Sequence, residues 1–571
     1  MKIFENKPQL LFFLILILLF FLRFWGLTAN GVQHDAAINA VRAAGWLDFL
    51  AGSGQTSPIS WFGEIPWWGS LSFHDHPPLV FWVENLSLKI FGENTFGVLV
   101  PFALAAMATG LILYYLVKKF ISPSAGLWAI LAFAVSSYAT WVSRAGYLEG
   151  IEYLFLALSI FFFAQYLDLR RGRFLAFWAG SVGLALLSKY TAIFLLPAAV
   201  LYLLFWDWRV LKTKIFWLSL LLIPAVLSPV IVYNFQVFQA TGHFDAALSS
   251  MLGMHPQDFE VIASRGINFN LGANFWSILD SLVTTASLPF LVLQGLALLF
   301  ALGQVVRRKA GVLTRLLLLH ILMIVVMFAF AGAQPRFLAI LTPFLTLNLG
   351  IVLYEWWGKI ATRPGTAQAL AGGGLLLIFA LELGYGINTN LLTKPLGRER
   401  IFYSPNRFYS QGFGELEQYL RDEVFVPLPP RRHVTKLEEL TYFDVKEPYV
   451  VIIDARADWF ATMWHVNRYS FYYNAPIVHF LDFHGLMKET GDAFAYLRKG
   501  GAVNFWFVLT TPAGIVGSPG DEEYQGAIRQ LQALLERSRV QPQKFIKNSR
   551  GQTVFEIYEF STAASASSGG S

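Results

Sequence analysis

A series of long apolar runs separated by short polar connections is the feature of this sequence that most limits its fold. Runs of this length are typical of helices that cross a bilayer about 30 Å thick. With 55% hydrophobic residues, 14% charged residues and a mean hydropathy of +0.51, the chain does not have the composition of a soluble globular protein. We therefore expect a mostly α-helical, polytopic membrane protein with about eleven transmembrane helices. Their expected ranges are 10–27, 96–117, 124–142, 146–167, 174–188, 190–206, 215–235, 276–305, 315–333, 336–357 and 368–389.

The basic residues test this count, because Lys and Arg collect in the cytoplasmic loops of membrane proteins. With eleven spans, all the main basic clusters fall on one side. These clusters are Lys2/Lys7, Lys118/Lys119, Arg170/Arg171/Arg173, Arg209/Lys212/Lys214, Arg307/Arg308/Lys309 and Lys359/Arg363. This agreement requires that the segment from Leu79 to Phe91 does not cross the membrane. At about 13 residues the segment is too short to span a bilayer. We therefore expect it to form a helix that lies at the membrane surface. The chain is thus expected in the cytoplasmic membrane.

Several classes of function are excluded or disfavoured by the same composition. A net charge of +6 could indicate a nucleic-acid partner, but no basic stripe with interleaved aromatic residues is present. The absence of cysteine excludes disulfides, thiolate metal sites and cysteine nucleophiles. The sequence also contains neither a P-loop nor a Rossmann fingerprint.

The character of the chain changes after about residue 390, where charged residues become frequent and apolar runs shrink to strand length. We predict a transmembrane domain over 1–390, with a first outer loop at 28–95 that carries surface helices. A soluble α/β domain on the outer side is expected over 391–560, followed by a disordered Ser/Ala/Gly tail at 561–571. The expected strands are 449–454, 477–481, 503–509 and 553–560, and the expected helices are 414–424, 486–498 and 521–537.

His74, Asp75 and His76 form a group of titratable residues immediately before Pro77 and Pro78. The two prolines fix φ and remove two backbone donors, which predicts a rigid, non-helical turn. Imidazole and carboxylate are suitable metal ligands, but adjacent residues seldom all face one ion, so a divalent metal at Asp75 and His76 would need a distant partner such as His243. Without a metal, Asp75 and His76 would orient a sugar or a lipid phosphate through hydrogen bonds.

Asp35 follows the first span and begins a stretch, 35–50, with helical spacing. Asp35, Asn39 and Arg42 lie on one face of such a helix, and Ala37, Val41, Ala44 and Leu47 form an apolar side. One interpretation is that Asp35 is only the N-cap of this helix. The other is a catalytic carboxylate at the membrane boundary that accepts a proton from a hydroxyl nucleophile.

Four further charged or titratable residues fall on the outer side of the predicted topology: Glu149, Lys189, His243 and Arg336. A boundary acid is costly unless it is paired, so we expect Glu149 to form a salt bridge with Arg144 or Arg42. Lys189 and Arg336 could simply extend toward the membrane surface. Together they would also suit an anionic head group, since Arg can bind phosphate oxygens in bidentate fashion.

These features resemble the GT-C superfamily of polytopic glycosyltransferases. The resemblance covers about residues 8–390, and its nearest branch is the protein O-mannosyltransferases and bacterial aminoarabinose transferases. It is carried by the acid after the first span, the Pro-Pro-Leu turn, Arg144 and Glu149, and the segments LSKYTAIFLLPA (187–198) and QPRFLAILTPFL (334–345). Two departures are Asp35-Ala36, where many relatives have an acidic pair, and His76, where relatives often have Lys.

The resemblance implies transfer of a sugar from a polyprenyl-phosphate donor to a hydroxyl of a lipid, glycan or protein acceptor, with inversion at the anomeric carbon. Asp35 is at the position of the catalytic base, while Asp75, His76, Glu149, Lys189, His243 and Arg336 fall near family positions that bind substrate, and we add Arg42 from its helix face. No cofactor is required by this chemistry, although a divalent ion at Asp75, His76 and His243 stays open. A transporter or flippase of lipid-linked sugars is the alternative, and a receptor whose outer domain binds a ligand is a third hypothesis.

Overall fold

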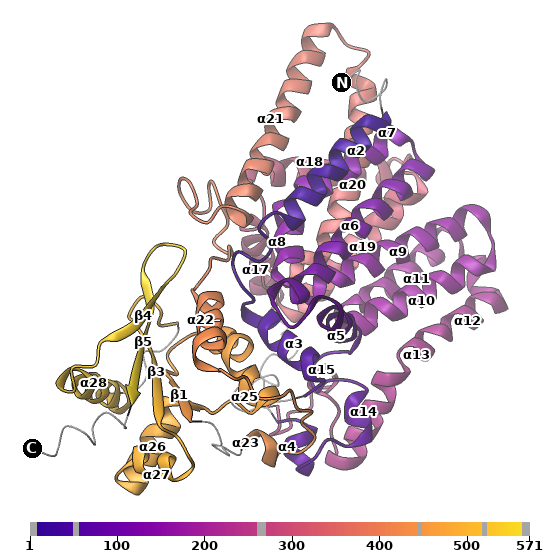
Figure 1. The fold of residues 1–571 in the computed structure, drawn as a ribbon. Helices are drawn as coiled ribbons and strands as arrows, with labels where there is room; N and C mark the ends of the chain where they lie inside the picture. Colours follow the sequence, from indigo (N-terminus) through magenta and orange to yellow (C-terminus); the bar gives the residue numbers. More distant parts are fainter. Residues whose placement is uncertain (1–7, 49–55, 260–269, 442–447, 517–521, 562–571) are drawn as a thin grey trace, which may run out of the picture. The chain divides into compact units, whose positions relative to one another are not determined.

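The computed structural model describes residues 8–48, 56–259, 270–441, 448–516 and 522–561 of the 571-residue chain (Figure 1). They form two compact units. The helical unit comprises Met1–Leu27, Leu50–Ser57 and Pro66–Phe408, and the C-terminal unit comprises Thr28–Phe49, Pro58–Ile65 and Tyr409–Ser571. The sequence-based division kept 28–95 with the apolar spans and placed a boundary near 390. The structure instead puts two segments of that first loop into the C-terminal unit.

The helical unit is built almost wholly from α-helices and short 3₁₀ turns. Its elements are α2 (Pro8–Phe24), η1 (Trp67–Ser70), α5 (Leu79–Phe91), α6 (Thr95–Phe120), α7 (Pro123–Val135), α8 (Ser137–Ala145), α9 (Leu148–Leu169), α10 (Gly172–Ser188), η2 (Tyr190–Phe194), α11 (Leu195–Trp206), η3 (Trp208–Lys212), α12 (Lys214–Leu220), α13 (Leu222–Val226), α14 (Ser228–Thr241), α15 (Ala246–Met251), α17 (Leu271–Val283), α18 (Leu288–Val306), α19 (Val312–Ala331), η4 (Phe337–Leu341), α20 (Thr342–Ile360) and α21 (Gly365–Asn390). The predicted turn at 74–78 is non-helical, and the helix predicted at 79–91 has these same bounds.

The predicted count of eleven spans is not confirmed. Among the described residues, six helices are long and apolar enough to cross a membrane, or up to eight if each of two bent pairs is one span. One pair, α7 and α8, bends by 58° at Ser136; the other bends by 59° near Leu227. Three shorter apolar helices, α2, α10 and the stretch Tyr190–Trp206, have 10–17 residues. The predicted span 276–305 is in fact two helices, α17 and α18, interrupted before Pro289.

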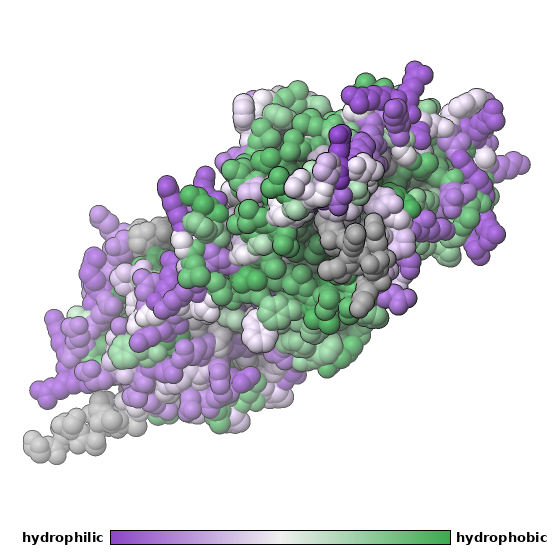
Figure 2. Space-filling view, turned by 90° about the horizontal axis from the view of Figure 1, so that it is seen from above, coloured by the Kyte–Doolittle hydropathy of each residue, from purple (hydrophilic) through white to green (hydrophobic). Residues whose placement is uncertain are grey.

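Close helix packing forms the core of this unit, where the buried side chains of α6, α7, α9, α10 and α20 meet. Gly350 lets α20 approach α7, because a Cβ there would lie 2.5 Å from both the N and the Cα of Ala129. Outer helices such as α18 and α21 keep large apolar side chains exposed, including Leu299, Val306 and Leu370. Figure 2 shows hydrophobic residues spread over the surface of the helical unit, as expected for a lipid-facing surface. The chain is an integral, multi-pass membrane protein.

The C-terminal unit contains a five-stranded mixed sheet in the order β2-β1-β3-β5-β4. β1 pairs in parallel with β2 and β3, while β5 is antiparallel to β3 and β4. Successive β1 residues point to opposite faces of the sheet. Val451 and Ile453 belong to one hydrophobic cluster, and Val450 and Ile452 belong to another, each of which includes helix residues. Helices therefore cover both faces of the sheet. The strands are β1 (Tyr449–Ile453), β2 (Ile477–His479), β3 (Asn504–Thr510), β4 (Pro542–Lys547) and β5 (Thr553–Ser561); the helices are α3 (His34–Gly45), α4 (Pro58–Phe62), α22 (Phe413–Tyr419), η5 (Leu420–Val424), α23 (Glu438–Thr441), α24 (Trp459–Thr462), η6 (Met463–Asn467), α25 (Arg468–Tyr473), α26 (Phe480–Thr490), α27 (Ala493–Lys499) and α28 (Glu522–Arg537).

The four predicted strands are present, with two local corrections. The helix predicted at 486–498 is two helices, α26 and α27, because Gly491 adopts a positive φ of 76° and Asp492 caps the second helix. β4 was not predicted, since it is an edge strand with several exposed polar residues and only Ile546 fully buried. Of the tail predicted to be disordered, 561–571, Ser561 is the last residue of β5, and the rest lies outside the described residues.

Gly350→Ala tests the packing of α20 on α7. The added methyl group would overlap backbone atoms of Ala129, so we expect a loss of about 1–3 kcal/mol from overpacking. Gly358→Ala is the matched control, because no atom lies within 4 Å of its Cβ position and Ala favours a helix by about 1 kcal/mol over Gly. Thermal unfolding of both variants in detergent measures the difference. Equal stability of the two variants would contradict this packing.

Candidate functional site

The segment Lys189–Thr191 positions much of the polar chemistry of the helical unit. α10 ends at Ser188, Lys189 takes an extended conformation, and η2 begins at Tyr190. The Lys189 ammonium forms an ion pair with the buried Glu149, and the Thr191 hydroxyl donates a 3.0 Å hydrogen bond to Glu152. Both acids lie in the first turns of α9, so this short segment connects the C-terminal end of α10 to the N-terminal end of α9.

Tyr190, between these two residues, reaches a different carboxylate. Its hydroxyl donates to Asp245 Oδ2 at 2.7 Å, and the Asn234 amide donates to the same oxygen at 2.8 Å. The other oxygen, Oδ1, accepts from the backbone N–H of Leu248 at 2.8 Å and caps α15. Burial and the charge of the nearby Asp75 raise the pKa of Asp245, against the lowering effect of these hydrogen bonds.

Lys189 and Arg336 lie against the same aromatic ring. The Lys189 Nζ is 4.8 Å from the centroid of Phe337, and the Arg336 Cζ is 4.7 Å from it. Burial lowers the pKa of Arg336 because it removes water from the guanidinium group. An anion bound beside this ring would replace the lost hydration, so the pair of cations is a candidate site for a phosphate group.

Asp75 lies between the two histidines of the turn before α5. Its Oδ1 is 3.0 Å from His76 Nδ1, and its Oδ2 is 3.9 Å from His74 Nε2. His74 is fully buried, the Asp75 side chain is 8% exposed and the His76 side chain is 32% exposed. The backbone N–H of Ala246 donates to the carbonyl of His74 at 2.7 Å, which brings the turn next to Asp245. The accessible member of this group is therefore His76.

His243 belongs to the same region but has another partner. Its Nε2 is 3.0 Å from Asp258 Oδ2, and its ring and that of His74 both lie against Phe259. Within the described ranges, no three His, Asp or Glu side chains are grouped so as to hold a metal ion. A divalent ion at Asp75, His76 and His243 stays a prediction.

We predicted a salt bridge from Glu149 to Arg144 or Arg42, but the ion pair that Glu149 forms is with Lys189. The Arg144 guanidinium donates to the carbonyls of Trp25 and Gly26, both at 2.8 Å. Arg144 therefore satisfies backbone carbonyls at the end of α2, which have no partner within the helix. Tyr190, Asn234 and Asp245 are site residues that sequence analysis did not single out. The only sequence signal was the position of Tyr190 beside Lys189 and that of Asp245 two residues after His243.

Asp35 and Arg42 lie in the C-terminal unit, on α3. The N-cap is Gln33, and Asp35 is in the first turn, so the interpretation of Asp35 as the N-cap is wrong. The positive end of the helix dipole favours an ionised carboxylate at this position. Arg42 is buried about two turns further along, 4.0 Å from Asp48.

Side chains from the C-terminal half of the chain hold α3 in place. Tyr472 Oη donates to the carbonyl of Val41 at 2.6 Å, and Arg431 Nη2 donates to that of Ala44 at 2.7 Å. Gly45 allows the Tyr472 ring to pack closely, since a Cβ there would lie 2.0 Å from the ring. The helix that carries Asp35 is thus held by Tyr472 of α25 and by Arg431.

A network centred on Glu417 supports the entry to α3. Glu417 forms an ion pair with the buried Arg468, and its Oε2 is 2.6 Å from His465 Nδ1. The other ring nitrogen of His465 is 3.2 Å from the carbonyl of Val32, three residues before Asp35. Burial acts to raise the pKa of Glu417, but Arg468 and His465 outweigh it and leave that pKa below its usual value.

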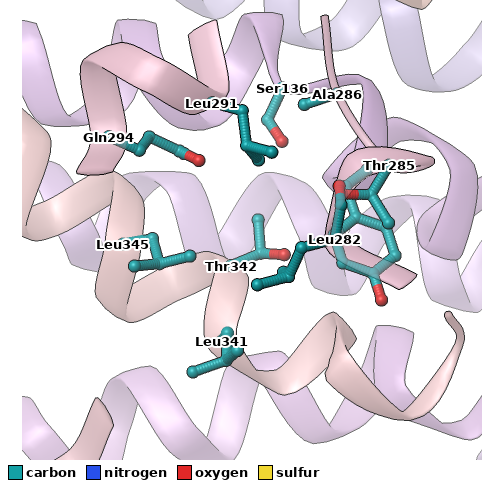
Figure 3. Close-up of a pocket in the computed structure, with 10 residues that line it drawn as sticks. Ser136, Leu282, Thr285, Ala286, Leu291, Gln294, Leu341, Thr342 and Leu345 are labelled. Carbon is teal, nitrogen blue, oxygen red and sulfur yellow. The ribbon is translucent and has the colours of Figure 1, made fainter. Parts of the chain in front are cut away.

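A separate pocket in the helical unit lies where α8 begins, beside α18 and α20. Figure 3 shows the oxygens of Ser136, Gln294 and Thr342 among the apolar side chains that line it. Tyr138, which also lines it, is buried, and its hydroxyl has no hydrogen-bond partner among the residues that the structure describes.

Comparisons with known proteins concern the family and the fold of this chain. A family model described as dolichyl-phosphate-mannose-protein mannosyltransferase matches residues 75–233, from Asp75 to Tyr233. An uncharacterized protein of Aquifex aeolicus (strain VF5) is 30% identical over 203 residues, or 34% of this chain and 36% of that protein. "Putative mannosyltransferase YycA" of Bacillus subtilis (strain 168) is 31% identical over 142 residues, or 25% of this chain and 21% of that protein. The chain thus matches well under half of the length of each curated relative.

The structural comparison covers nearly the whole chain. The crystal structure of ArnT from Cupriavidus metallidurans bound to undecaprenyl phosphate matches with a TM-score of 0.53 at 11% identity, over 96% of this chain and 97% of that one. At this identity the match shows a common fold. The predicted resemblance to the GT-C superfamily is confirmed by the family model, the curated relatives and this fold.

The pKa of Glu417 predicts a pH-dependent stability. Because its folded-state pKa lies below 4.5, the stabilisation is complete above pH 4.5 and is lost as the pH falls through the folded-state value. Glu417→Gln leaves the buried Arg468 without its carboxylate, which should cost about 3–5 kcal/mol at neutral pH. The difference in stability between Glu417→Gln and the unmodified protein should become smaller at acid pH. Thermal unfolding between pH 3.5 and 7 measures it, and Glu415→Gln, an exposed acid two residues away, should have little effect. A stability difference between Glu417→Gln and the unmodified protein that does not change with pH would contradict the lowered pKa of Glu417.

Proposed function

We propose that this protein is a glycosyltransferase that moves a sugar from a polyprenyl-phosphate donor to an acceptor hydroxyl on the outer face of the cytoplasmic membrane. The observation that carries the proposal is the pair of cations, Lys189 and Arg336, against Phe337. This pair occurs in a chain with the fold of ArnT, which was crystallised with undecaprenyl phosphate. A lipid, a glycan or a protein would supply the hydroxyl.

The cations would bind the phosphate of the donor and stabilise it as the leaving group. When the bond between the anomeric carbon and the phosphate oxygen breaks, negative charge builds up on that oxygen. Fixed cations in a poorly hydrated site stabilise this charge strongly, since no solvent has to reorganise. Glu149 holds Lys189 in position, while Arg336 provides a planar donor suited to two phosphate oxygens.

Asp35 would act as the general base. It accepts the proton of the acceptor hydroxyl while that oxygen forms a bond to the anomeric carbon and the polyprenyl phosphate departs. A single displacement of this kind inverts the anomeric configuration. The position of Asp35 in the first turn of α3 supports this role, because the helix dipole favours the ionised form that a base requires.

The turn at 74–76 would contact the sugar. His76 is the accessible residue there, and its Nδ1 lies 3.0 Å from the Asp75 carboxylate. His243 and Arg42 would contribute to substrate binding near their own partners, Asp258 and Asp48. The transfer requires no resident cofactor, and adding a chelator to the assay tests the divalent ion considered for Asp75, His76 and His243.

Asp35→Asn should lower transfer by about 10²–10⁴-fold, the usual contribution of a general base, while donor binding is kept. The measurement is consumption of a polyprenyl-phosphate sugar by the purified protein in detergent with a pool of acceptors. Asp422→Asn, an exposed acid of the same unit, is the control and should transfer normally. Normal turnover by Asp35→Asn would reject its assignment as the base.

Arg336→Gln should weaken binding of free polyprenyl phosphate by about 10–100-fold, as expected for the loss of a charge-assisted hydrogen bond. The affinity is measured by titrating the lipid phosphate into the purified protein. Arg363→Gln, in the exposed connection between α20 and α21, should bind as the unmodified protein does. If Arg336→Gln and Arg363→Gln bound equally well, the phosphate site would have to be sought elsewhere.

A further inference from the structure

The loop that follows the last apolar helix, residues 391–403, exposes three large apolar side chains. Leu396 is 69% exposed, Ile401 58% and Phe402 55%. α21 ends at Asn390, and in Figure 1 the chain leaves that end as a protruding loop. Because α21 is one of the helices able to cross the membrane, the loop begins at a membrane boundary.

The loop is built by specific hydrogen bonds from the last turns of α21. The Asn388 amide donates to the carbonyls of Leu396 at 2.8 Å and Phe402 at 2.9 Å, and its oxygen accepts from the N–H of Leu396 at 2.7 Å. Gly397 has a positive φ of 79°, and a Cβ there would lie 2.6 Å from the Phe402 ring. The exposed apolar residues are therefore held in place by the structure.

Three cations accompany these apolar residues. Lys394, Arg398 and Arg400 are all exposed, and Glu399 is the single acid among residues 391–403. Apolar side chains flanked by Lys and Arg fit the boundary between acyl chains and anionic head groups. A soluble protein partner would require a surface that complements both features, whereas the adjoining helix α21 is already long and apolar enough to lie in a bilayer.

We propose that the 391–403 loop is a membrane-interface anchor. Leu396, Ile401 and Phe402 enter the head-group region of the leaflet, and Lys394, Arg398 and Arg400 bind the phosphates of anionic lipids. The anchor fixes the chain at the membrane surface six residues before Tyr409, where the long segment of the C-terminal unit begins. This assignment does not depend on the proposed glycosyl transfer.

The absence of native cysteine allows a direct test, because a single introduced cysteine carries the only label. Leu396→Cys and Phe402→Cys are labelled separately with a nitroxide in nanodiscs of phosphatidylethanolamine and phosphatidylglycerol. Collisions with a water-soluble nickel chelate are expected to be at least about three-fold less frequent than at Phe545→Cys, as for an interfacial position. Phe545 is a matched control, an exposed Phe on β4 of the C-terminal unit. Labels at 396 and 402 that the chelate reaches as readily as at 545 would overturn the anchor.

The lipid charge is tested in the Leu396→Cys background. Replacing Lys394, Arg398 and Arg400 by Gln should raise chelate access to the label in anionic nanodiscs and change it little in phosphatidylcholine nanodiscs. The four measurements compare the native loop and the Gln-substituted loop in anionic and in phosphatidylcholine nanodiscs. Equal chelate access to the label in all four would overturn the binding of anionic head groups. Since all the substituted side chains are exposed, the protein is expected to fold in each case.

Discussion

The ion pair between Lys189 and Glu149 is the interaction on which the polar centre of the helical unit depends. Both groups are largely removed from water, so either one alone would be a costly buried charge. The pair connects the end of α10 to the start of α9. This connection fixes the backbone of the next two residues, from which Tyr190 reaches Asp245 and Thr191 reaches Glu152. Three carboxylates thus receive their partners from three consecutive residues.

The same reasoning explains the role of the C-terminal half of the chain in holding α3. A twelve-residue helix is marginal by itself in water, and α3 contains many small residues, so its stability has to come from packing. Tyr472 and Arg431 bind carbonyls in its second half, and His465 binds the carbonyl of Val32 just before it. A domain that looks independent in the sequence therefore supports the helix with the proposed catalytic base.

Sequence patterns predicted the elements of this fold better than their breaks and partners. Hydrophobic period and length located most of the apolar helices, and two prolines defined the start of α5. The bend at Ser136 and the division of 276–305 depend on tertiary contacts: Glu382 of α21 accepts hydrogen bonds from the backbone N–H groups of Ser137 and Ser287 at these two breaks. No local pattern could show that a residue 95 or more positions away would satisfy those donors.

The same distinction applies to the candidate site, where the sequence indicated several of the residues but not their partners. Residue type and predicted side of the membrane were enough to select Lys189, Arg336 and Asp75, because charged residues in an apolar chain are costly and need a reason. They could not select partners, since Arg144 is only five residues from Glu149 but binds backbone carbonyls of Trp25 and Gly26. Asp245 was assigned no role for a related reason: that role depends on a fold that brings residue 246 against residue 74.

The environment of the two neighbouring aspartates assigns them different tasks. Asp245 is fully buried, caps α15 and accepts hydrogen bonds from Tyr190 and Asn234, so its oxygens are already used within the protein. The Asp75 side chain is also mostly buried, at 8% exposed, but its charge acts on Asp245 and its carboxylate lies 3.0 Å from His76 Nδ1. Because both acids are enclosed while the His76 side chain is 32% exposed, the imidazole is the group of this cluster that solvent reaches. A cluster of acids in this fold can therefore be mostly structural and still present one polar side chain for binding.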